Sequence, residues 1–208
     1  MADPKVCVAL DGTTVEEMID EAARANLAGA DMVEVRFDRL YLISPDPTIA
    51  DEEEGEIVEL PPEVDWDTKD MSSIDVDIAI SSLKEGLPLP VIFTVRPVSE
   101  GGFFPGVESE RLDILRKAIE SEVSWIDLEL SIPESERDGL GKLAKENSCK
   151  IIASKHDING VPDSDDIAKI VRDNQEKGDI VKFCGTAQNH SDALQIIEAA
   201  MQLKGEGL

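Results

Sequence analysis

The chain has 208 residues, of which 41% are hydrophobic, and 20 basic against 45 acidic side chains give it a formal net charge of −25. This length and hydrophobic share suit one globular domain with a sizeable core. A surface this negative repels nucleic acid and anionic lipid, so neither is expected as a partner. The sequence also has no apolar run long enough for a transmembrane helix.

The N-terminus and the cysteines both indicate a reducing compartment. The chain enters a strand-like pattern almost at once, without the basic and apolar regions of a signal peptide. Cys7, Cys149 and Cys184 lie far apart, which argues against a disulfide framework or a zinc site. Cys7 and Cys184 stand in apolar runs, so we expect both to be buried. These features predict a cytoplasmic protein.

The charge of −25 has two interpretations. It is typical of a protein from a salt-adapted, halophilic organism, in which ions screen the repulsion between carboxylates. It also suits an ordinary acidic protein with one very acidic loop. Stability that rises steeply with salt would support the first interpretation, and a flat response would exclude it.

The first part of the chain predicts a strand, a helix and a second strand, over residues 5–10, 15–27 and 32–37. Thr13 or Thr14 is placed to cap the helix, and its apolar residues follow helical spacing. In the second strand, Glu34 and Arg36 share one face. Two charges on one strand face are costly in a dry core unless they are paired, so this face meets water, a partner or a polar pocket.

Periodicity fades over the next segment. It holds several prolines and the acidic run Asp51-Glu52-Glu53-Glu54. We expect residues 39–73 to form an acidic, exposed insertion loop.

From residue 74 onward, helices and strands alternate. The third strand ends at Arg96 and leads into a Gly-rich loop, which lacks the Gly-Lys-Ser/Thr ending of a phosphate-binding loop. Helices are expected over residues 74–85, 109–121 and 191–203. A further helix is expected to end near residue 147, and another to begin at residues 163–166. The expected strands cover residues 91–95, 125–130, 150–154 and 180–184.

Such alternation predicts an α/β fold with a parallel sheet. Two closures compete, an open doubly wound sheet and a (β/α)8 TIM barrel. The segment after the first strand, Asp11-Gly12-Thr13-Thr14, is a poor match to the Gly-rich fingerprint of the open sheet. A barrel collects polar residues from many strands at its C-terminal mouth, as this pattern does. We therefore expect a single (β/α) barrel domain over residues 1–208, with about six βα units.

Two polar residues stand out within the apolar strands. His156 follows the fifth strand, and Lys182 lies inside the sixth. A lysine in an apolar strand loses solvation, which favours its neutral form. A neutral amine beside a histidine that can move protons is equipment for Schiff-base chemistry on a carbonyl substrate. Either residue taken alone is more often structural.

Five segments together resemble type I 3-dehydroquinate dehydratase. Each lies at a predicted strand end, and they occur in the family's order over essentially the whole chain apart from the insertion. The segments are Glu34-Val-Arg-Phe-Asp38, Phe93-Thr-Val-Arg-Pro-Val-Ser-Glu-Gly-Gly102, Asp127-Leu-Glu129, Ser154-Lys-His-Asp157 and Asp179-Ile-Val-Lys182.

This resemblance implies a lyase of the shikimate pathway, in aromatic amino acid biosynthesis, that converts 3-dehydroquinate into 3-dehydroshikimate. It implies a (β/α)8 barrel with no metal and no organic cofactor, and a homodimer. In this family pattern Lys182 forms an imine with the substrate, His156 acts as general acid and base, and Glu100 orients the histidine. The substrate-binding residues would be Glu34, Arg36 and Arg96.

Structural roles stand beside these functional ones. Glu34 and Arg36 would then be a salt-bridged pair, and Arg96 would simply pair with Glu100. Polar bracing is the role we expect for Asp127 and Glu129, and a loop or capping role is expected for His190.

The chain departs from the family at its end. The family's last two units carry an arginine and a Ser/Gln-bearing loop that bind the substrate carboxylate, and residues after Lys204 do not supply them. We therefore expect a C-terminally incomplete barrel, which leaves open a fragment, a second polypeptide or a naturally short chain. The alternative functions are another class I aldolase-type Schiff-base barrel and a catalytically inert truncated fragment.

Overall fold

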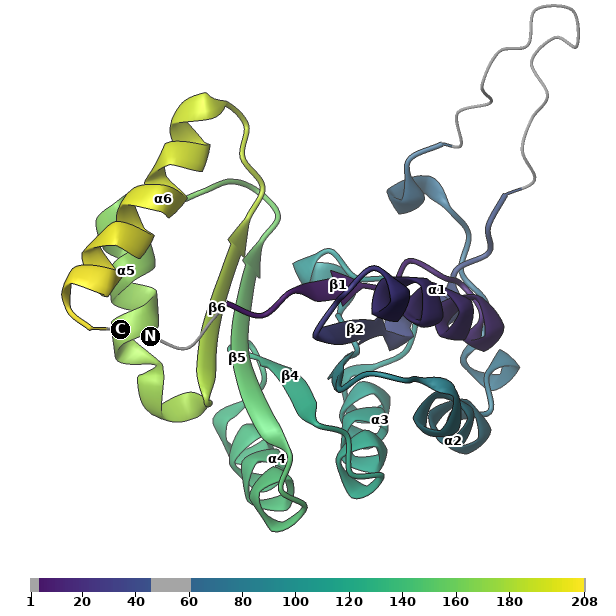
Figure 1. The fold of residues 1–208 in the computed structure, drawn as a ribbon. Helices are drawn as coiled ribbons and strands as arrows, with labels where there is room; N and C mark the ends of the chain where they lie inside the picture. The colour runs from purple at the N-terminus through teal and green to yellow at the C-terminus, as the bar shows by residue number, and fades with distance from the viewer. Residues whose placement is uncertain (1–3, 46–60, 208) are drawn as a thin grey trace, which may run out of the picture.

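The computed structural model describes residues 4–45 and 61–207. Six parallel strands form one sheet in the order β1-β2-β3-β4-β5-β6, so each strand pairs with the strand before it in the chain. Figure 1 shows the sheet curving into an open half-barrel, with β1 and β6 at its edges. This arrangement confirms the predicted α/β fold with six βα units. The strands are β1 Cys7–Ala9, β2 Met32–Arg36, β3 Val91–Thr94, β4 Trp125–Glu129, β5 Lys150–Asp157 and β6 Ile180–Gly185.

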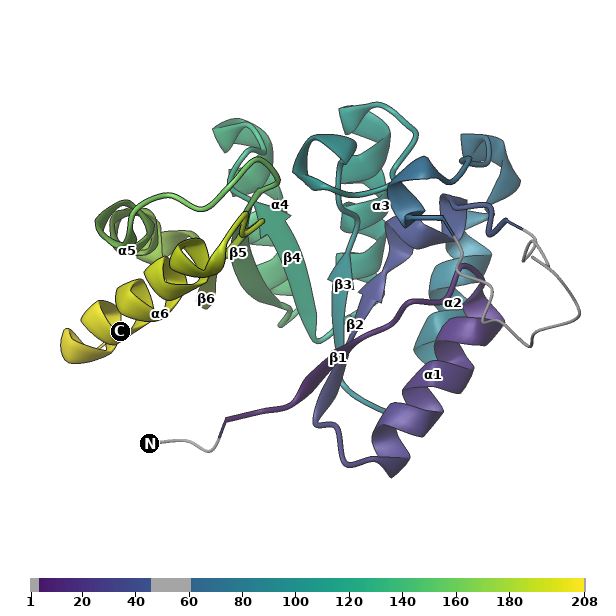
Figure 2. The same cartoon turned by 90° about the horizontal axis from the view of Figure 1, so that it is seen from above.

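A helix follows every strand, and the helices surround the outer face of the sheet (Figure 2). The first helix starts where the sequence predicts, because Thr14 accepts a hydrogen bond from the amide of Glu17 and the Glu17 carboxylate accepts one from the amide of Thr14. The helices are α1 Val15–Leu27, α2 Val76–Gly86, α3 Glu108–Glu120, α4 Glu134–Glu146, α5 Ser164–Asp173 and α6 His190–Gly205.

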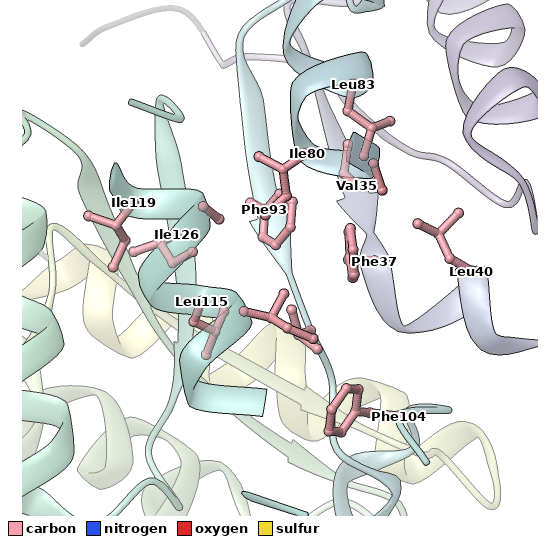
Figure 3. Packing of buried hydrophobic residues seen from close by; sticks show 14 of the residues in the cluster. Val35, Phe37, Leu40, Ile80, Leu83, Phe93, Phe104, Leu115, Ile119 and Ile126 are labelled. Atoms are coloured by element: carbon pink, nitrogen blue, oxygen red, sulfur yellow. The ribbon is translucent and has the colours of Figure 1, made fainter. Parts of the chain in front are cut away.

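The hydrophobic core lies between the outer face of the sheet and the helices. Side chains alternate along each strand, so Val35 and Phe37 from the β2 region and Phe93 from β3 point outward together (Figure 3). The rings of Phe37 and Phe93 lie 5.2 Å apart. Helix residues that include Ile80 and Leu115 cover them. Apolar side chains therefore hold the helices, which leaves the opposite face of the sheet to polar residues.

The predicted insertion is wrong at its start, because residues 39–42 are buried rather than exposed. Phe37–Tyr41 forms a 3-10 turn directly after β2. The Tyr41 ring packs edge-on against Phe104, 5.6 Å away, and Arg39 binds the carboxylate of Glu63. The acidic run 51–54 lies outside the described residues. Short 3-10 turns at Glu63–Asp65 and Met71–Ser73 return the chain to α2.

The burial predicted for two cysteines is also wrong. Cys7 is exposed and Cys184 is of intermediate exposure, whereas Cys149 is buried. Cys7 and Cys184 belong to β1 and β6, the edge strands, each of which pairs with only one neighbouring strand among residues 4–45 and 61–207. An apolar run therefore does not ensure burial at the edge of an open sheet.

One predicted boundary and one expected burial differ toward the C-terminal part of the chain. Strand β5 runs on to Asp157, so His156 lies within the strand rather than after it. Helix α6 forms as expected, but Leu194, Ile197 and Met201 on its apolar face are exposed. None of the helices that the structure describes is long and apolar enough to cross a membrane.

Candidate active site

The inner face of the sheet is polar. Register partners on neighbouring parallel strands share a face, so Glu129 lies beside Ser154, Ser154 beside Lys182, and His156 beside Cys184. Parallel strands also bring their carboxyl ends to the same edge. The polar face comprises Glu34, Arg36, Thr94, Arg96, Asp127, Glu129, Ser154, His156, Lys182 and Cys184.

Glu100 contacts His156 at this face through two atoms of the histidine. Glu100 ends the 3-10 turn Val98–Glu100 that follows β3. Its Oε2 lies 3.1 Å from His156 Nδ1 and accepts the backbone N–H of His156 at 3.0 Å. Ser131 donates to the other carboxylate oxygen. Burial opposes ionisation of Glu100, but the hydrogen bonds from His156 and Ser131 outweigh it and lower the pKa of Glu100.

This contact fixes the tautomer of the imidazole. An ionised carboxylate can only accept, so Nδ1 of His156 carries the proton and a neutral ring has its lone pair on Nε2. Nε2 is buried and has no hydrogen-bond partner among the described residues. Burial lowers the pKa of His156, but Cys184 and Glu100 together outweigh burial and raise it. The ring is therefore held at one nitrogen and free to exchange a proton at the other.

The Gly-rich loop places Glu100 by packing tightly on β3. A Cβ atom on Gly102 would lie 2.0 Å from the carbonyl oxygen of Arg96, which no side chain can do without moving the backbone. Gly101 has φ of 77°, in the left-handed region that favours glycine. The glycines therefore serve loop geometry and the position of Glu100.

Lys182 lies across the polar face from two carboxylates. Its Nζ is 3.6 Å from Asp127 Oδ2 and 3.8 Å from Glu34 Oε1. Both distances exceed those of a direct hydrogen bond. The side chain is 29% exposed, so the amine is reachable from the open side of the sheet.

Asp127 lies close to Lys182, which the sequence analysis did not foresee. Its side chain is fully buried, as expected for polar bracing, and its Oδ2 is 3.6 Å from the Lys182 amine and 3.9 Å from Arg96. Neither of its oxygens has a hydrogen-bond partner within residues 4–45 and 61–207. Burial raises the pKa of Asp127, and Lys182 opposes that rise. Only the strand register reveals this contact. Asp127 pairs with Ile152, and Ile152 pairs with Ile180, which lies two residues before Lys182 on the same face of β6.

The ion pairs expected as purely structural alternatives, Glu34 with Arg36 and Arg96 with Glu100, do not form; these residues have other partners. Arg36 does not bind Glu34; its guanidinium donates two hydrogen bonds to Asp38, at 2.9 and 2.7 Å. Arg96 does not bind Glu100; its NH2 group lies 3.2 Å from Glu34 Oε1. The hydroxyl of Thr94 donates to the same oxygen of Glu34.

Asp38 was missed as a site residue. Besides Arg36, it accepts the backbone N–H groups of Arg96 and Phe103. A fully buried carboxylate with four donors fixes both Arg36 and the start of the Gly-rich loop. The sequence shows only that an aspartate follows Arg36 by two positions.

The remaining polar predictions have structural positions. Glu129 is fully buried against Arg111, in keeping with the bracing role expected for it. His190 opens α6 and is exposed, while Asn189 caps that helix by accepting the amides of Ser191 and Asp192.

Two other features contribute no catalytic group. In the part of the chain that the structure describes, no group of three or more His, Cys, Asp or Glu side chains is arranged to hold a metal ion. A wide groove on the outer surface runs between α4 and the turn before β6, lined in part by Arg137, Lys142 and Lys177. It contains none of the predicted site residues.

Known proteins share both the sequence and the fold. The family model for type I 3-dehydroquinase matches residues 6–207. A 3-dehydroquinate dehydratase from Methanopyrus kandleri is 29% identical over 194 residues, which are 93% of this chain and 72% of that protein. A chloroplastic bifunctional 3-dehydroquinate dehydratase/shikimate dehydrogenase from Arabidopsis thaliana is 30% identical over 193 residues, and the match covers 92% of this chain but only 26% of that protein.

A solved structure agrees. The type I 3-dehydroquinate dehydratase from Clostridium difficile superimposes with a TM-score of 0.74 at 24% identity, over 96% of this chain and 69% of that one. A match of the family model to nearly the whole chain, together with this shared fold, makes the chain a member of the type I 3-dehydroquinase family.

Proposed function

We propose that this protein dehydrates 3-dehydroquinate to 3-dehydroshikimate through an imine on Lys182, with His156 as the general acid and base. Family membership supports the substrate, and the relatives bear the same activity in their names. The observation that carries the proposal is the state of His156. Glu100 holds one ring nitrogen, and the other is unoccupied on the same face as Lys182.

The first step joins the amine to the substrate. Nζ of Lys182 attacks the ketone carbon, the carbinolamine loses water, and a protonated imine forms. The contacts of the amine to Asp127 and Glu34 are at ion-pair distance but longer than hydrogen bonds, so the amine can turn to the substrate carbonyl once it has lost its proton.

The second step uses the imine as an electron sink. Nε2 of His156 takes the proton from the carbon next to the imine, and the electron pair of that bond moves toward the nitrogen to give an enamine. The enamine then expels the hydroxyl group one carbon further on, to which His156 returns the proton, so that water leaves. Hydrolysis of the imine releases the enone and restores Lys182.

Glu100 assists by charge. Its lowered pKa keeps it ionised near neutral pH, so it stabilises the imidazolium that forms when His156 takes the proton. The short path from carboxylate to imidazole also fixes the ring plane. Glu100 is therefore a positioning residue, which acts through His156.

Three charged residues are proposed to hold the substrate hydroxyls. Arg96 keeps a buried Nε–H without a partner in the described part of the chain, which a substrate oxygen can fill. Arg36 is locked by Asp38, so its orientation does not depend on substrate. Glu34 accepts from Thr94 and Arg96, and it holds the Arg96 guanidinium in place.

The test is to trap the imine. The chain is mixed with 3-dehydroquinate and borohydride in high salt, and the intact mass and the peptide map are measured. We expect one adduct, on Lys182. Lys182→Met should abolish it, whereas Lys155→Met should not, because Lys155 is the neighbouring lysine on β5 and points to the opposite face. Borohydride trapping reports imine formation alone, so it does not require the later elimination and hydrolysis steps.

The outcomes of the trapping experiment distinguish the proposed function from its alternatives. An adduct that persists in Lys182→Met protein would refute the nucleophile. Trapping with a sugar phosphate and none with 3-dehydroquinate would indicate an aldolase-type enzyme instead. No adduct at all from a sample that circular dichroism shows to be folded would favour the inert alternative.

A further inference from the structure

Cys184 lies beside the two residues that carry the proposed chemistry. It follows Lys182 by two positions on β6, so both side chains point to the same face of the strand. Across the sheet, Cys184 is the register partner of His156. It is a free thiol of intermediate exposure. The dehydration proposed above gives it no role, which makes its position on this face a separate feature.

The three cysteines of the chain differ sharply in environment. Burial raises the pKa of the Cys149 thiol to about 12; the exposed Cys7 thiol also has a raised pKa, from partial desolvation by its surroundings and from the charge of Glu34. Burial acts on Cys184 in the same direction, but contact with the His156 imidazole and the nearby cations outweighs it and lowers the pKa. Thiolate is the reactive form of cysteine, so the chain contains one activated thiol and two internal controls.

His156 provides an independent observation at the same place. Its side chain is only 7% exposed, and Nε2 has no hydrogen-bond partner within the described ranges. Glu100 occupies Nδ1, so Nε2 is the nitrogen left to serve the neighbouring thiol. A buried imidazole nitrogen without a partner, next to a free thiol, forms a pair in which the ring can accept the proton of the thiol.

We propose that Cys184 is a covalent modification site for soft electrophiles and for disulfides of small thiols, and that the added group closes the site around His156 and Lys182. His156 Nε2 takes the thiol proton, and the thiolate sulfur attacks one sulfur of the disulfide. The disulfide bond breaks, the second half leaves as a thiolate, and that thiolate takes up the proton from His156. A new mixed disulfide and one free thiol result, and a reducing thiol reverses the step.

The consequence for activity rests on the function proposed above. A group attached to Cys184 would lie beside His156 and on the same face of β6 as Lys182. It would obstruct the access of substrate to His156 Nε2 and to the Lys182 amine. Modification would therefore switch the site off without unfolding the chain, and reduction would restore it.

The first experiment measures reactivity without substrate. The native chain is treated with limiting iodoacetamide, and separately with dithiodipyridine, at neutral pH, and the labelled peptides are quantified over time. We expect Cys184 to react at least about tenfold faster than Cys7, although Cys7 is the more exposed thiol. Equal or faster labelling of Cys7 would overturn the proposal. This result stands apart from the proposed function, since no dehydration is measured.

The second experiment measures the effect of the label. Wild-type and Cys184→Ala chains are treated with dithiodipyridine, then with 3-dehydroquinate and borohydride. We expect imine trapping to fall in the treated wild-type chain, to persist in treated Cys184→Ala protein, and to return to wild type after reduction. Labelling of Cys184 with undiminished trapping would refute the closure of the site. Absence of trapping in untreated protein would count against the proposed function and leave the reactivity result intact.

Discussion

Arg111 on α3 donates a 2.7 Å hydrogen bond to Glu129 on β4, and both side chains are almost completely buried. The same guanidinium donates to the carbonyl of Val95 and to Glu108. Burial raises the pKa of Glu129 to about 7, and Arg111 opposes that rise. One arginine thus ties α3 to the carboxyl ends of β3 and β4.

Removing Arg111 should destabilise the fold strongly. Arg111→Met leaves the Glu129 carboxyl buried without its partner, and breaking a buried pair in this way costs about 3–5 kcal/mol. We expect a drop of that size in the free energy of unfolding, measured in urea. Arg111→Met combined with Glu129→Gln should recover a substantial part of it. Arg116→Met is the matched control, because Arg116 is 39% exposed and should lose no more than about 1 kcal/mol. Equal losses at Arg111 and Arg116 would refute the bracing role.

Replacing Glu100 should change how stability depends on pH. The pKa of Glu100 is lowered from 4.5, so its contribution is full above 4.5 and is lost as pH falls through the lower folded value. The pKa of His156 is raised from 6.5, so its contribution is full below 6.5 and is lost as pH rises through the higher folded value. The free energy of unfolding of the wild type should therefore exceed that of Glu100→Gln most between pH 4.5 and pH 6.5, by about 1–3 kcal/mol.

The measurement is the free energy of unfolding of both chains across that pH range. The advantage of the wild type should shrink on either side of the window. A difference that stays constant with pH would mean that Glu100 contributes packing rather than a charged hydrogen bond to His156.

Gly102 should tolerate no side chain. In Gly102→Ala protein the Cβ would meet the Arg96 carbonyl at 2.0 Å, so the loop must shift and carry Glu100 with it. We expect lower stability and weaker dehydration. Gly139→Ala is the matched change: Gly139 lies in α4 with nothing within 4 Å of the added carbon, so it should gain up to about 1 kcal/mol in stability. Normal activity in Gly102→Ala protein would show that the loop does not set the position of Glu100.

The two histidines should separate imine formation from proton transfer. His156→Ala should lower the dehydration rate by about 10²–10⁴-fold, the usual contribution of a general acid–base group, while borohydride still traps the imine on Lys182. His190→Ala should behave as wild type, because His190 is exposed at the start of α6. The dehydration rate is measured in steady state, and imine trapping is measured by intact mass on the same samples. Loss of trapping together with rate in His156→Ala would assign His156 to imine formation as well.

Salt should stabilise the chain. With a net charge of −25 the folded surface repels itself, and screening weakens that repulsion. We expect the midpoint of thermal unfolding to rise steadily from low to molar potassium chloride. A midpoint that does not move would exclude adaptation to high salt and leave an acidic protein of the ordinary kind.

The sequence predicted the fold well because the relevant signal is local. Alternation of strand-like and helix-like segments was enough for a parallel sheet with six βα units, and Lys182 stood out as a charge within an apolar strand. Thr14 was one of two expected caps, and it is the one used. These features depend on residues within one or two turns of each other.

Other features depend on contacts between distant residues, which spacing does not reveal. Tyr41 is buried because Phe104 packs against it, so the start of the expected insertion belongs to the core. Asp127 meets Lys182 only through the register of three strands. Cys184 is only partly buried because its strand lies at a sheet edge. Hydrophobic pattern alone therefore misplaces Tyr41 and Cys184, and it does not reveal the contact between Asp127 and Lys182.

The strand order has a consequence for how the chain folds. Every strand pairs with its immediate predecessor in sequence. The partner of each strand is therefore synthesised before the strand itself. Loop-closure entropy stays small when contacts are close in sequence, and domains form progressively as a polypeptide is synthesised. The sheet can therefore grow from β1 toward β6 as the chain leaves the ribosome. Lys182 and Cys184, on the last strand of that series, would join a polar face that the earlier strands have already assembled.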